Sequence, residues 1–219
     1  RSMIDQTREH YERDGYLSAQ DVLTKEEVGE LLAAASLPEI QQAQEELGSR
    51  ERTVHLLELS VRHPIFAELA ADPRLIERLR PLLGEDIQLQ HSKLASKPPT
   101  PGKGQFRMHQ DFAYFPHTNT DLAAVTVYLD DATQDNGCLQ VWPGSHRRGL
   151  LNHLDDDGHF TGGCVEPLPA DEFVDLVQPA GSISIHHCLT MHGSPPNRSG
   201  DPRRFIVFEY RADDAYQLA

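Results

Sequence analysis

The pattern of apolar and polar residues changes near residue 86, and this change restricts the fold more than any other feature. Beyond it, short apolar or alternating runs are interrupted by Pro, Gly, Asn and Asp, as in strands joined by turns. Many short strands at regular spacing are typical of a sandwich or a barrel. The predicted strands are Ile87 to Ala95, Ala123 to Leu129, Cys138 to Trp142, Ser182 to His187 and Phe205 to Tyr210.

A tight turn is predicted between the strands that end at Leu129 and begin at Cys138. Asn136-Gly137 lies in this interval. The dipeptide is typical of a two-residue β-hairpin, because both central positions of the favoured turn need a positive φ. We therefore expect these two strands to form a hairpin.

The first third of the chain has helical patterns. Thr24 and Glu27 form a capping box ahead of apolar residues at helical spacing. Asp72-Pro73 is a second helix start, and Gly84 suits the end of that helix. The expected fold class is therefore mainly β with flanking helices. We expect one domain over residues 1–219, with a helical flank over about 3–84 and a β-barrel core over about 86–211.

Length and charge restrict the class of partner. A chain of 219 residues can bury a core without disulfides, and its net charge of −14 disfavours nucleic acid and anionic membranes. No apolar run approaches the length of a membrane span, which favours a soluble, cytoplasmic protein. The acidity also weakly disfavours a highly anionic substrate, although a local basic pocket could override it. The sequence does not indicate an oligomeric state.

Two smaller features of the sequence do not bear on the function. Arg1 and Ser2 precede Met3 and are interpreted as an expression scar. The three cysteines are widely spaced and contain no C-x-x-C pair, which disfavours a disulfide framework or a thiolate zinc site. We expect buried free thiols.

The chemistry is indicated by an H-x-D motif at His109 and Asp111. In an extended strand these side chains project to the same side, because side chains alternate with period two. A second histidine on a facing strand would complete a two-histidine, one-carboxylate triad of the kind associated with iron(II) oxygenases. His192 is the candidate, since it follows the apolar strand that ends at His187. H-x-D alone is weak evidence, because it arises by chance in many chains.

A pair of arginines strengthens this interpretation. Arg203 and Arg204 open an apolar strand after the turn that follows His192. The planar donors of arginine can bind both oxygens of a carboxylate, such as the one two carbons beyond a metal-chelating keto acid. Adjacent strand residues face opposite sides, so only one of the two can reach a barrel interior.

Several segments together carry a family resemblance. They are Lys97-Pro98-Pro99, Met108 to Asp111, Tyr114 to Pro116, Asp135 to Leu139, Trp142 to His146, His192 to Ser194, Asn197 to Ser199 and Arg203. With them the chain resembles the phytanoyl-CoA dioxygenase family of iron(II)/2-oxoglutarate-dependent oxygenases. The resemblance implies a double-stranded β-helix core, of the jelly-roll or cupin-like kind, with the N-terminal helices packed on it.

The resemblance also implies the roles of individual residues. His109, Asp111 and His192 would be the iron ligands at the catalytic centre. Arg203, eleven positions after His192, would bind the far carboxylate of 2-oxoglutarate with help from the hydroxyl of Ser194. The implied reaction is hydroxylation of an aliphatic C–H bond of a small molecule by dioxygen, coupled to decarboxylation of 2-oxoglutarate to succinate.

Two other functions fit the residues less well. A halogenase on the same scaffold would have a small residue in place of the carboxylate ligand, and Asp111 argues against it. A cupin-like binding protein without turnover would not need both an intact triad and Arg203. The prime substrate stays open among acyl-CoA thioesters, amino-acid-like solutes and biosynthetic intermediates.

Further candidates surround the predicted site. Tyr114, Phe115, Trp142 and His91 are candidates for a substrate pocket, and His55, His117 and His153 for its lining. Of His186 and His187, one is expected to pack in the core and the other to approach the site. The loop from His153 to Asp171 is long, polar and rich in glycine, so we predict a mobile cover over the barrel mouth.

Overall fold

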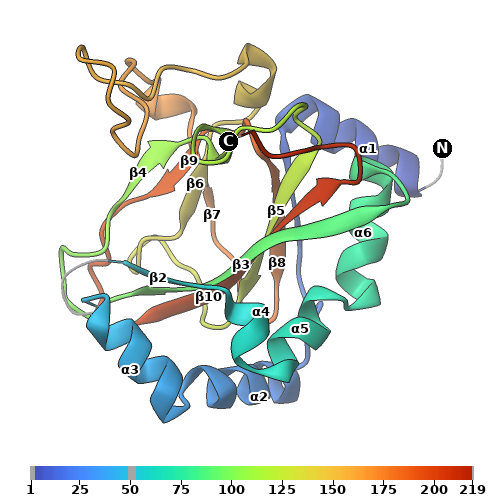
Figure 1. Ribbon diagram of the computed structural model, residues 1–219. Helices are drawn as coiled ribbons and strands as arrows, with labels where there is room; N and C mark the ends of the chain where they lie inside the picture. The colour runs from blue at the N-terminus through green and yellow to red at the C-terminus, as the bar shows by residue number, and fades with distance from the viewer. Residues whose placement is uncertain (1–2, 49–52, 219) are drawn as a thin grey trace.

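Two antiparallel sheets face each other around a central interior in the computed structural model, which describes residues 3–48 and 53–218 (Figure 1). Arg1 and Ser2, interpreted above as an expression scar, lie outside the described residues. The larger sheet has the order β1-β8-β5-β10-β3-β2, and the smaller has the order β4-β9-β6-β7. This arrangement is the predicted double-stranded β-helix.

The strands of the larger sheet are β1 (Tyr16–Ala19), β2 (Val54–Leu57), β3 (Ile87–Lys97), β5 (Leu122–Tyr128), β8 (Ile183–His187) and β10 (Arg203–Ala212). Those of the smaller sheet are β4 (Phe106–His109), β6 (Leu139–Val141), β7 (Val174–Leu176) and β9 (His192–Ser194). Each of the five predicted strands therefore has its counterpart.

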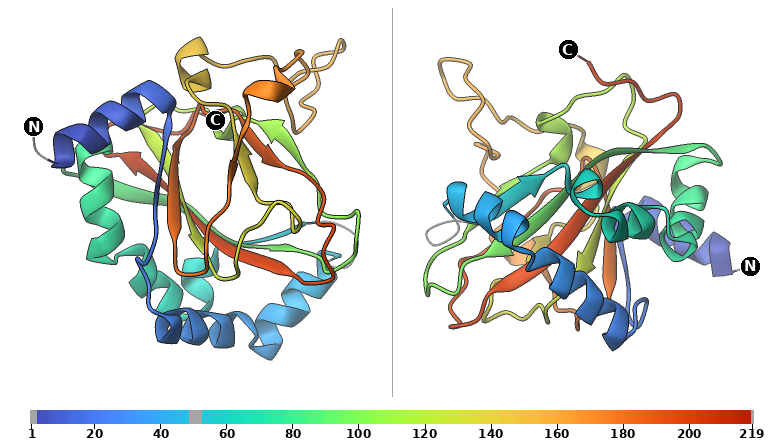
Figure 2. Two further views of the ribbon diagram at one scale, coloured as in Figure 1. Left: turned by 180° about the vertical axis from the view of Figure 1, so that it is seen from behind. Right: turned by 60° about the horizontal axis from the view of Figure 1, so that its bottom comes forward.

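The α-helices all lie before β3 in the described chain and cover one side of the barrel (Figures 1 and 2). None of the described helices is long and apolar enough to cross a membrane. Short 3-10 turns occur at η1 (Asp111–Ala113), η2 (Ser145–Arg148) and η3 (Ala170–Glu172). The α-helices are α1 (Met3–Asp14), α2 (Lys25–Ala35), α3 (Pro38–Glu46), α4 (Leu59–Arg62), α5 (Pro64–Ala70) and α6 (Pro73–Leu83).

The alternation of side chains along β10 separates the packing core from the barrel interior. Ile206, Phe208 and Tyr210 belong to the large hydrophobic core that the helices share with the outer face of the sheet. Arg203 and Val207 face the other way and line an internal cavity. The period of two thus places apolar packing on one face and polar chemistry on the other.

The predicted helix starts are confirmed, and one arginine links the two helix N-termini. The Glu27 amide donates to the Thr24 hydroxyl at 3.2 Å, and the Thr24 amide donates to the Glu27 carboxylate at 2.7 Å. At the start of α6, Asp72 accepts the amide of Arg74 at 2.8 Å. The Arg74 guanidinium then lies 2.7 Å from both the Glu27 and the Asp72 carboxylates, which joins α2 to α6.

The N-terminal flank also contributes two strands that the sequence patterns did not predict. Strand β1 pairs with β8, and β2 pairs with β3, at opposite edges of the larger sheet. Each has four residues, which is too short for a distinctive alternation. Pairing with a longer neighbour, rather than local sequence, decides their conformation.

The prediction of a hairpin at Asn136-Gly137 is wrong. Strand β5 belongs to the larger sheet and β6 to the smaller, so the intervening loop crosses between sheets. Gly137 has a φ of 72°, while Asn136 is not among the described residues with positive φ. The Asn136 side chain accepts from the Thr133 amide at 2.8 Å and donates to the Asp131 carbonyl at 2.7 Å. These hydrogen bonds stabilise a wider turn than the predicted one.

Gly137→Ala tests this close-packed crossing. A Cβ atom at Gly137 would lie 2.4 Å from the Pro195 carbonyl oxygen, in addition to the unfavourable positive φ. We expect the free energy of unfolding to fall by about 2–4 kcal/mol. Gly158→Ala is the control, because its φ is 82° but a Cβ there has no neighbour within 4 Å, so its cost is about 1 kcal/mol. Equal losses in urea denaturation of the two variants would contradict the predicted clash.

Candidate functional site

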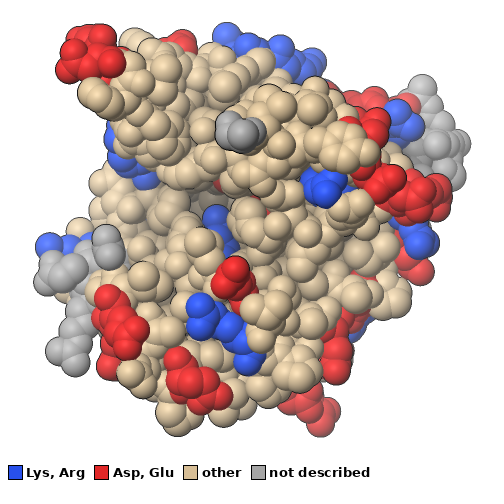
Figure 3. Space-filling model, viewed as in Figure 1, with Lys and Arg blue, Asp and Glu red and all other residues tan. Residues whose placement is uncertain are grey.

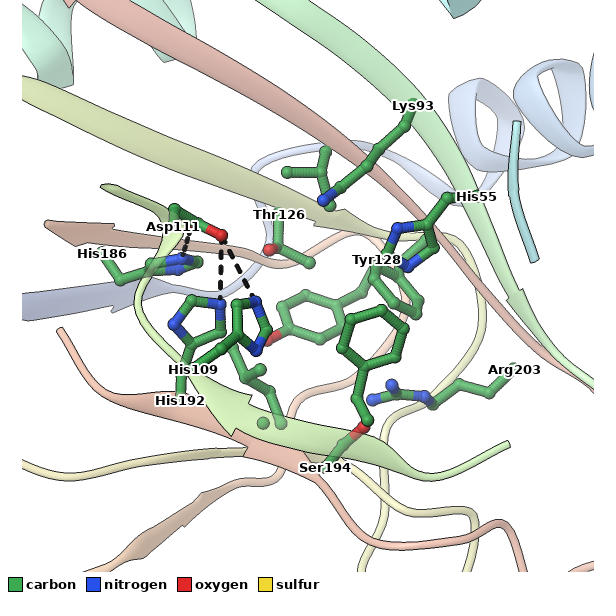
Figure 4. Close-up of a pocket in the computed structure, with 15 residues that line it drawn as sticks. His55, Lys93, His109, Asp111, Thr126, Tyr128, His186, His192, Ser194 and Arg203 are labelled. Atoms are coloured by element: carbon green, nitrogen blue, oxygen red, sulfur yellow. Dashed lines mark hydrogen bonds and ion pairs between the residues drawn. The ribbon is translucent and has the colours of Figure 1, made fainter. Parts of the chain in front are cut away.

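Three predicted ligands converge where β4 meets β9. These strands pair with His109 opposite His192, and Asp111 lies two residues beyond the end of β4. The Nε2 atoms of His109 and His192 lie 3.4 and 3.6 Å from Oδ1 of Asp111. All three side chains are buried, and their ligand atoms lie within 4.8 Å of one another (Figure 4). This spacing can hold one metal ion.

The hydrogen bonds of the two imidazoles indicate a metal site rather than a cluster with a purely structural role. Nδ1 of His109 lies 2.7 Å from the Arg107 carbonyl, and Nδ1 of His192 lies 2.8 Å from the Thr190 carbonyl. A carbonyl can only accept, so both Nδ1 atoms donate, and in the neutral ring the Nε2 atom that faces Asp111 then carries a lone pair. Burial also lowers the pKa of His192 well below its ordinary value, which keeps the ring neutral. Two imidazole Nε2 atoms and a carboxylate oxygen that converge at one point suit a divalent cation.

A third histidine, His186, contacts the other oxygen of the Asp111 carboxylate. Its Nε2 lies 3.0 Å from Oδ2 of Asp111, so the oxygen that faces the two ligand histidines is Oδ1. His187, the next residue in β8, lies in a separate cavity with Tyr11 and His146. The expectation that only one of the two histidines approaches the site is confirmed.

Arg203 lies in a narrow internal cavity that begins at the three candidate ligands. Its guanidinium is 4.7 Å from the centre of the Phe205 ring, and only 2% of the residue is exposed. Burial lowers the pKa of Arg203 to about 10, so it stays cationic at neutral pH. The cavity lining, which includes Ser194, comprises His55, Lys93, Phe106, His109, Asp111, Thr126, Tyr128, Leu139, His186, His192, Gly193, Ser194, Arg203, Phe205 and Val207.

Arg204 points away from this cavity, as strand geometry predicts. Its guanidinium donates to both carboxylate oxygens of Asp130, each at 2.8 Å. Among the described residues, by contrast, the buried Nε of Arg203 has no hydrogen-bond partner. The two adjacent arginines therefore differ in role: one is engaged within the protein, and the other is open to a ligand.

A second cavity of about 470 Å³ opens from the candidate metal centre toward solvent. This volume falls in the range of small-molecule sites, roughly 300–1,000 Å³. Its described lining comprises His55, Leu57, Glu58, Gln90, His91, Lys93, Phe106, His109, Asp111, Tyr114, Phe115 and Gln217. Figure 3 shows the hollow on this face, with positively charged atoms inside it.

The structure brings only some of the proposed pocket residues to this cavity. His91, Tyr114 and Phe115 line it, whereas Trp142 does not line either cavity within residues 3–48 and 53–218. The Trp142 indole donates to the Glu172 carboxylate at 2.7 Å. Its ring also lies under the Arg148 guanidinium at 4.6 Å. Trp142 therefore anchors the loop that precedes β7 rather than contacting the site.

The loop from His153 to Asp171 lies against the strand that carries the H-x-D motif. Tyr114 donates to the Gly162 carbonyl at 2.7 Å, and its ring contacts Phe160 at 4.8 Å. Gln110 stands between His109 and Asp111 in the sequence, and its backbone amide donates to Nε2 of His153 at 3.1 Å. The loop thus borders the site through Tyr114, in keeping with a cover, while its movement stays a prediction.

Sequence reasoning missed three polar residues that line the narrow cavity: Lys93, Thr126 and Tyr128. All lie on strands that were predicted. The sequence patterns do not show which face of each strand turns toward the barrel interior. The cross-strand register shows it. Lys93 pairs with Val207, and Thr126 pairs with the same residue from the other side.

His186→Phe tests the positioning of Asp111. The variant keeps an aromatic ring but removes the hydrogen bond to Oδ2, so metal affinity is expected to fall about 10–100-fold. Competition with a coloured chelator measures it. His187→Phe changes the same kind of residue on the opposite side of the strand and should leave metal affinity within a few-fold. Equal affinities for His186→Phe and the wild type would contradict the positioning role.

Comparison with known proteins agrees with the resemblance. A model of the phytanoyl-CoA dioxygenase family (PhyH) matches residues 11–205. A probable alpha-ketoglutarate-dependent hypophosphite dioxygenase of Stutzerimonas stutzeri is 32% identical over 235 residues, covering 98% of this chain and 80% of that protein.

Solved structures support the same fold. The apo form of the non-haem monooxygenase ThoJ superposes with a TM-score of 0.81 at 24% identity, over 97% of this chain and 80% of that one. EctD from S. alaskensis with 2-oxoglutarate and 5-hydroxyectoine gives a TM-score of 0.75 at 27% identity, over 94% and 75% of the two chains. Because the family model spans most of the sequence and the site has the matching geometry, the chain belongs to the phytanoyl-CoA dioxygenase family of iron(II)/2-oxoglutarate-dependent oxygenases.

Proposed function

We propose that the chain, acting as one oxygenase domain, hydroxylates an aliphatic C–H bond of a small molecule. Dioxygen and 2-oxoglutarate are consumed, and succinate, carbon dioxide and the alcohol are formed. The observation that carries this proposal is the convergence of His109, Asp111 and His192 at the junction of a narrow cavity that holds Arg203 and a wider one open to solvent. The first cavity suits the co-substrate, and the second suits the substrate.

The three converging residues would hold iron(II), which would activate dioxygen, the oxidant of the reaction, with 2-oxoglutarate as the two-electron donor. The protein's own part is to position these groups and to exclude water. The backbone carbonyls of Arg107 and Thr190 orient the two imidazoles. His186 fixes the Asp111 carboxylate through its other oxygen, so each proposed ligand is held by a hydrogen bond before a metal arrives.

Asp111→Ala tests the proposed metal centre. Loss of the carboxylate removes one of three protein donors, so iron(II) content and succinate formation should both fall to background. Asp156→Ala, which removes an equal charge from the exposed loop, is the control and should retain both. Metal analysis and an assay of succinate from 2-oxoglutarate measure the outcome. Near wild-type metal content and turnover in Asp111→Ala would refute the assignment.

Arg203→Ala tests the proposed 2-oxoglutarate site. Removing one member of a desolvated charge pair costs on the order of 2–5 kcal/mol, which is at least a tenfold loss of affinity. Iron(II) should still bind, because no proposed ligand has changed. Arg203→Lys should recover part of the affinity, since a point charge cannot form two parallel hydrogen bonds.

Arg204→Ala is the matched control, because its guanidinium pairs with Asp130 outside the cavity. Titration of 2-oxoglutarate into the anaerobic iron(II) protein, followed by its charge-transfer absorption, gives the dissociation constants. An unchanged dissociation constant for Arg203→Ala would contradict the assignment of Arg203 to 2-oxoglutarate binding. A large change for Arg204→Ala alone would assign this role to Arg204.

A second candidate reaction is oxidation of a phosphorus oxyanion. The relative from S. stutzeri, at 32% identity, is named for hypophosphite, which carries P–H rather than C–H bonds. An assay for phosphite formed from hypophosphite separates this reaction from C–H hydroxylation. The halogenase alternative stays disfavoured, because Asp111 occupies the position that chloride would need.

A further inference from the structure

Lys93 points into the space between the two cavities. It lies on β3 and lines both the narrow cavity and the wide one, together with His109 and Asp111 (Figure 4). Its cross-strand partner Val207 also faces the interior. The inward direction therefore follows from the register of the sheet rather than from the flexibility of the side chain.

No acidic side chain of the described residues neutralises this ammonium group. Lys93 has neither an ion pair within 4.0 Å nor a side-chain hydrogen bond within residues 3–48 and 53–218. Arg204 and Arg74, by contrast, each donate to carboxylates at less than 3 Å. Lys93 is also partly buried, so water satisfies it less well than it would a surface lysine.

The other ionisable groups near Lys93 leave its charge uncompensated. Burial, and then Lys93 itself, lower the pKa of His91 to about 4, so this imidazole is neutral. Burial raises the pKa of Glu209 well above its ordinary value, which favours the uncharged acid. Glu58 is exposed at the cavity edge, and under the proposed function the charge of Asp111 is taken up by the metal. Lys93 is the one lysine or arginine in the described lining of the wide cavity.

The rest of the wide cavity suits an organic body. Phe106 stacks on His55 at 4.5 Å, and Phe115 contacts His91 edge-on at 5.1 Å. These rings and Tyr114 form apolar walls around a volume of about 470 Å³. A bare inorganic anion would leave most of this surface without contact.

We propose that the prime substrate is a small organic acid whose oxyanion group binds Lys93 while its apolar body lies against Phe106 and Phe115. This inference rests on the proposed function, because it assumes that the wide cavity receives the substrate. Binding of the acid group at Lys93 holds the remainder of the molecule beside His109 and Asp111. The local cation outweighs the acidity of the whole chain at this point.

Isothermal titration calorimetry with three probes of equal chain length tests the proposal. The probes are hexanoate, hexylphosphonate and hexan-1-ol, titrated into the anaerobic iron(II) protein saturated with 2-oxoglutarate. Both acids should bind the wild type at least about tenfold more tightly than the alcohol, since only they pair with the ammonium. Lys93→Gln should remove this advantage and leave the alcohol nearly unchanged.

Lys25→Gln is the matched control, because Lys25 is an exposed residue at the start of α2 and its loss changes the net charge equally. It should preserve the preference for acids. Lys93→Arg should restore part of the preference lost in Lys93→Gln. Circular dichroism of each variant verifies that it folds.

Three outcomes would overturn the proposal. The first is that neither acid binds the wild type more tightly than the alcohol. The second is that Lys93→Gln keeps the preference for acids. The same holds if Lys93→Gln instead weakens the binding of 2-oxoglutarate about tenfold, which would place Lys93 in the co-substrate site. The third is Lys93-dependent binding of hypophosphite without binding of either organic acid. Failure of the proposed function is distinct, because the wild type would then show no 2-oxoglutarate charge-transfer absorption.

Discussion

The antiparallel pairing of β4 with β9 is the constraint on which the site depends. It places His109 opposite His192, and a shift of one residue would turn an imidazole away from Asp111. Gly193 permits the close approach, because a Cβ there would lie 2.7 Å from the Met108 sulfur and 2.9 Å from the Phe106 carbonyl oxygen. The position of the candidate metal centre is thus set by backbone contact as much as by the ligands themselves.

The larger sheet joins this centre to the rest of the molecule through its two faces. Its outer face packs on the helices through residues such as Ile206 and Phe208, whose burial supplies stability. Its inner face carries Arg203 and Glu209, which are almost completely buried. Burying such groups without partners costs stability, so the apolar outer face offsets a polar interior that suits ligand binding.

Local charge in the barrel differs from the charge of the chain as a whole. The net charge is −14, yet Lys93, Lys97 and Arg203 all lie on the adjacent strands β3 and β10. Burial, followed by the nearby Arg203, lowers the pKa of Lys97 to about 7. Average acidity disfavours polyanionic partners but is a poor guide to a single pocket, because a pocket responds to the few charges that face it.

The sequence by itself determined the class of fold, the helix starts at Thr24 and Asp72, the positions of strands β3, β5, β6, β8 and β10, and the candidate ligands, because these depend on local periodicity and on motifs. It also indicated that Arg203 and Arg204 face opposite sides, since alternation is a local property. Only the tertiary structure decided that the Asn136-Gly137 turn crosses between sheets, that Trp142 lies away from the cavities and that Lys93 faces inward. Those features depend on which strands pair and in which register, and the pairing is fixed by contacts between residues far apart in the chain.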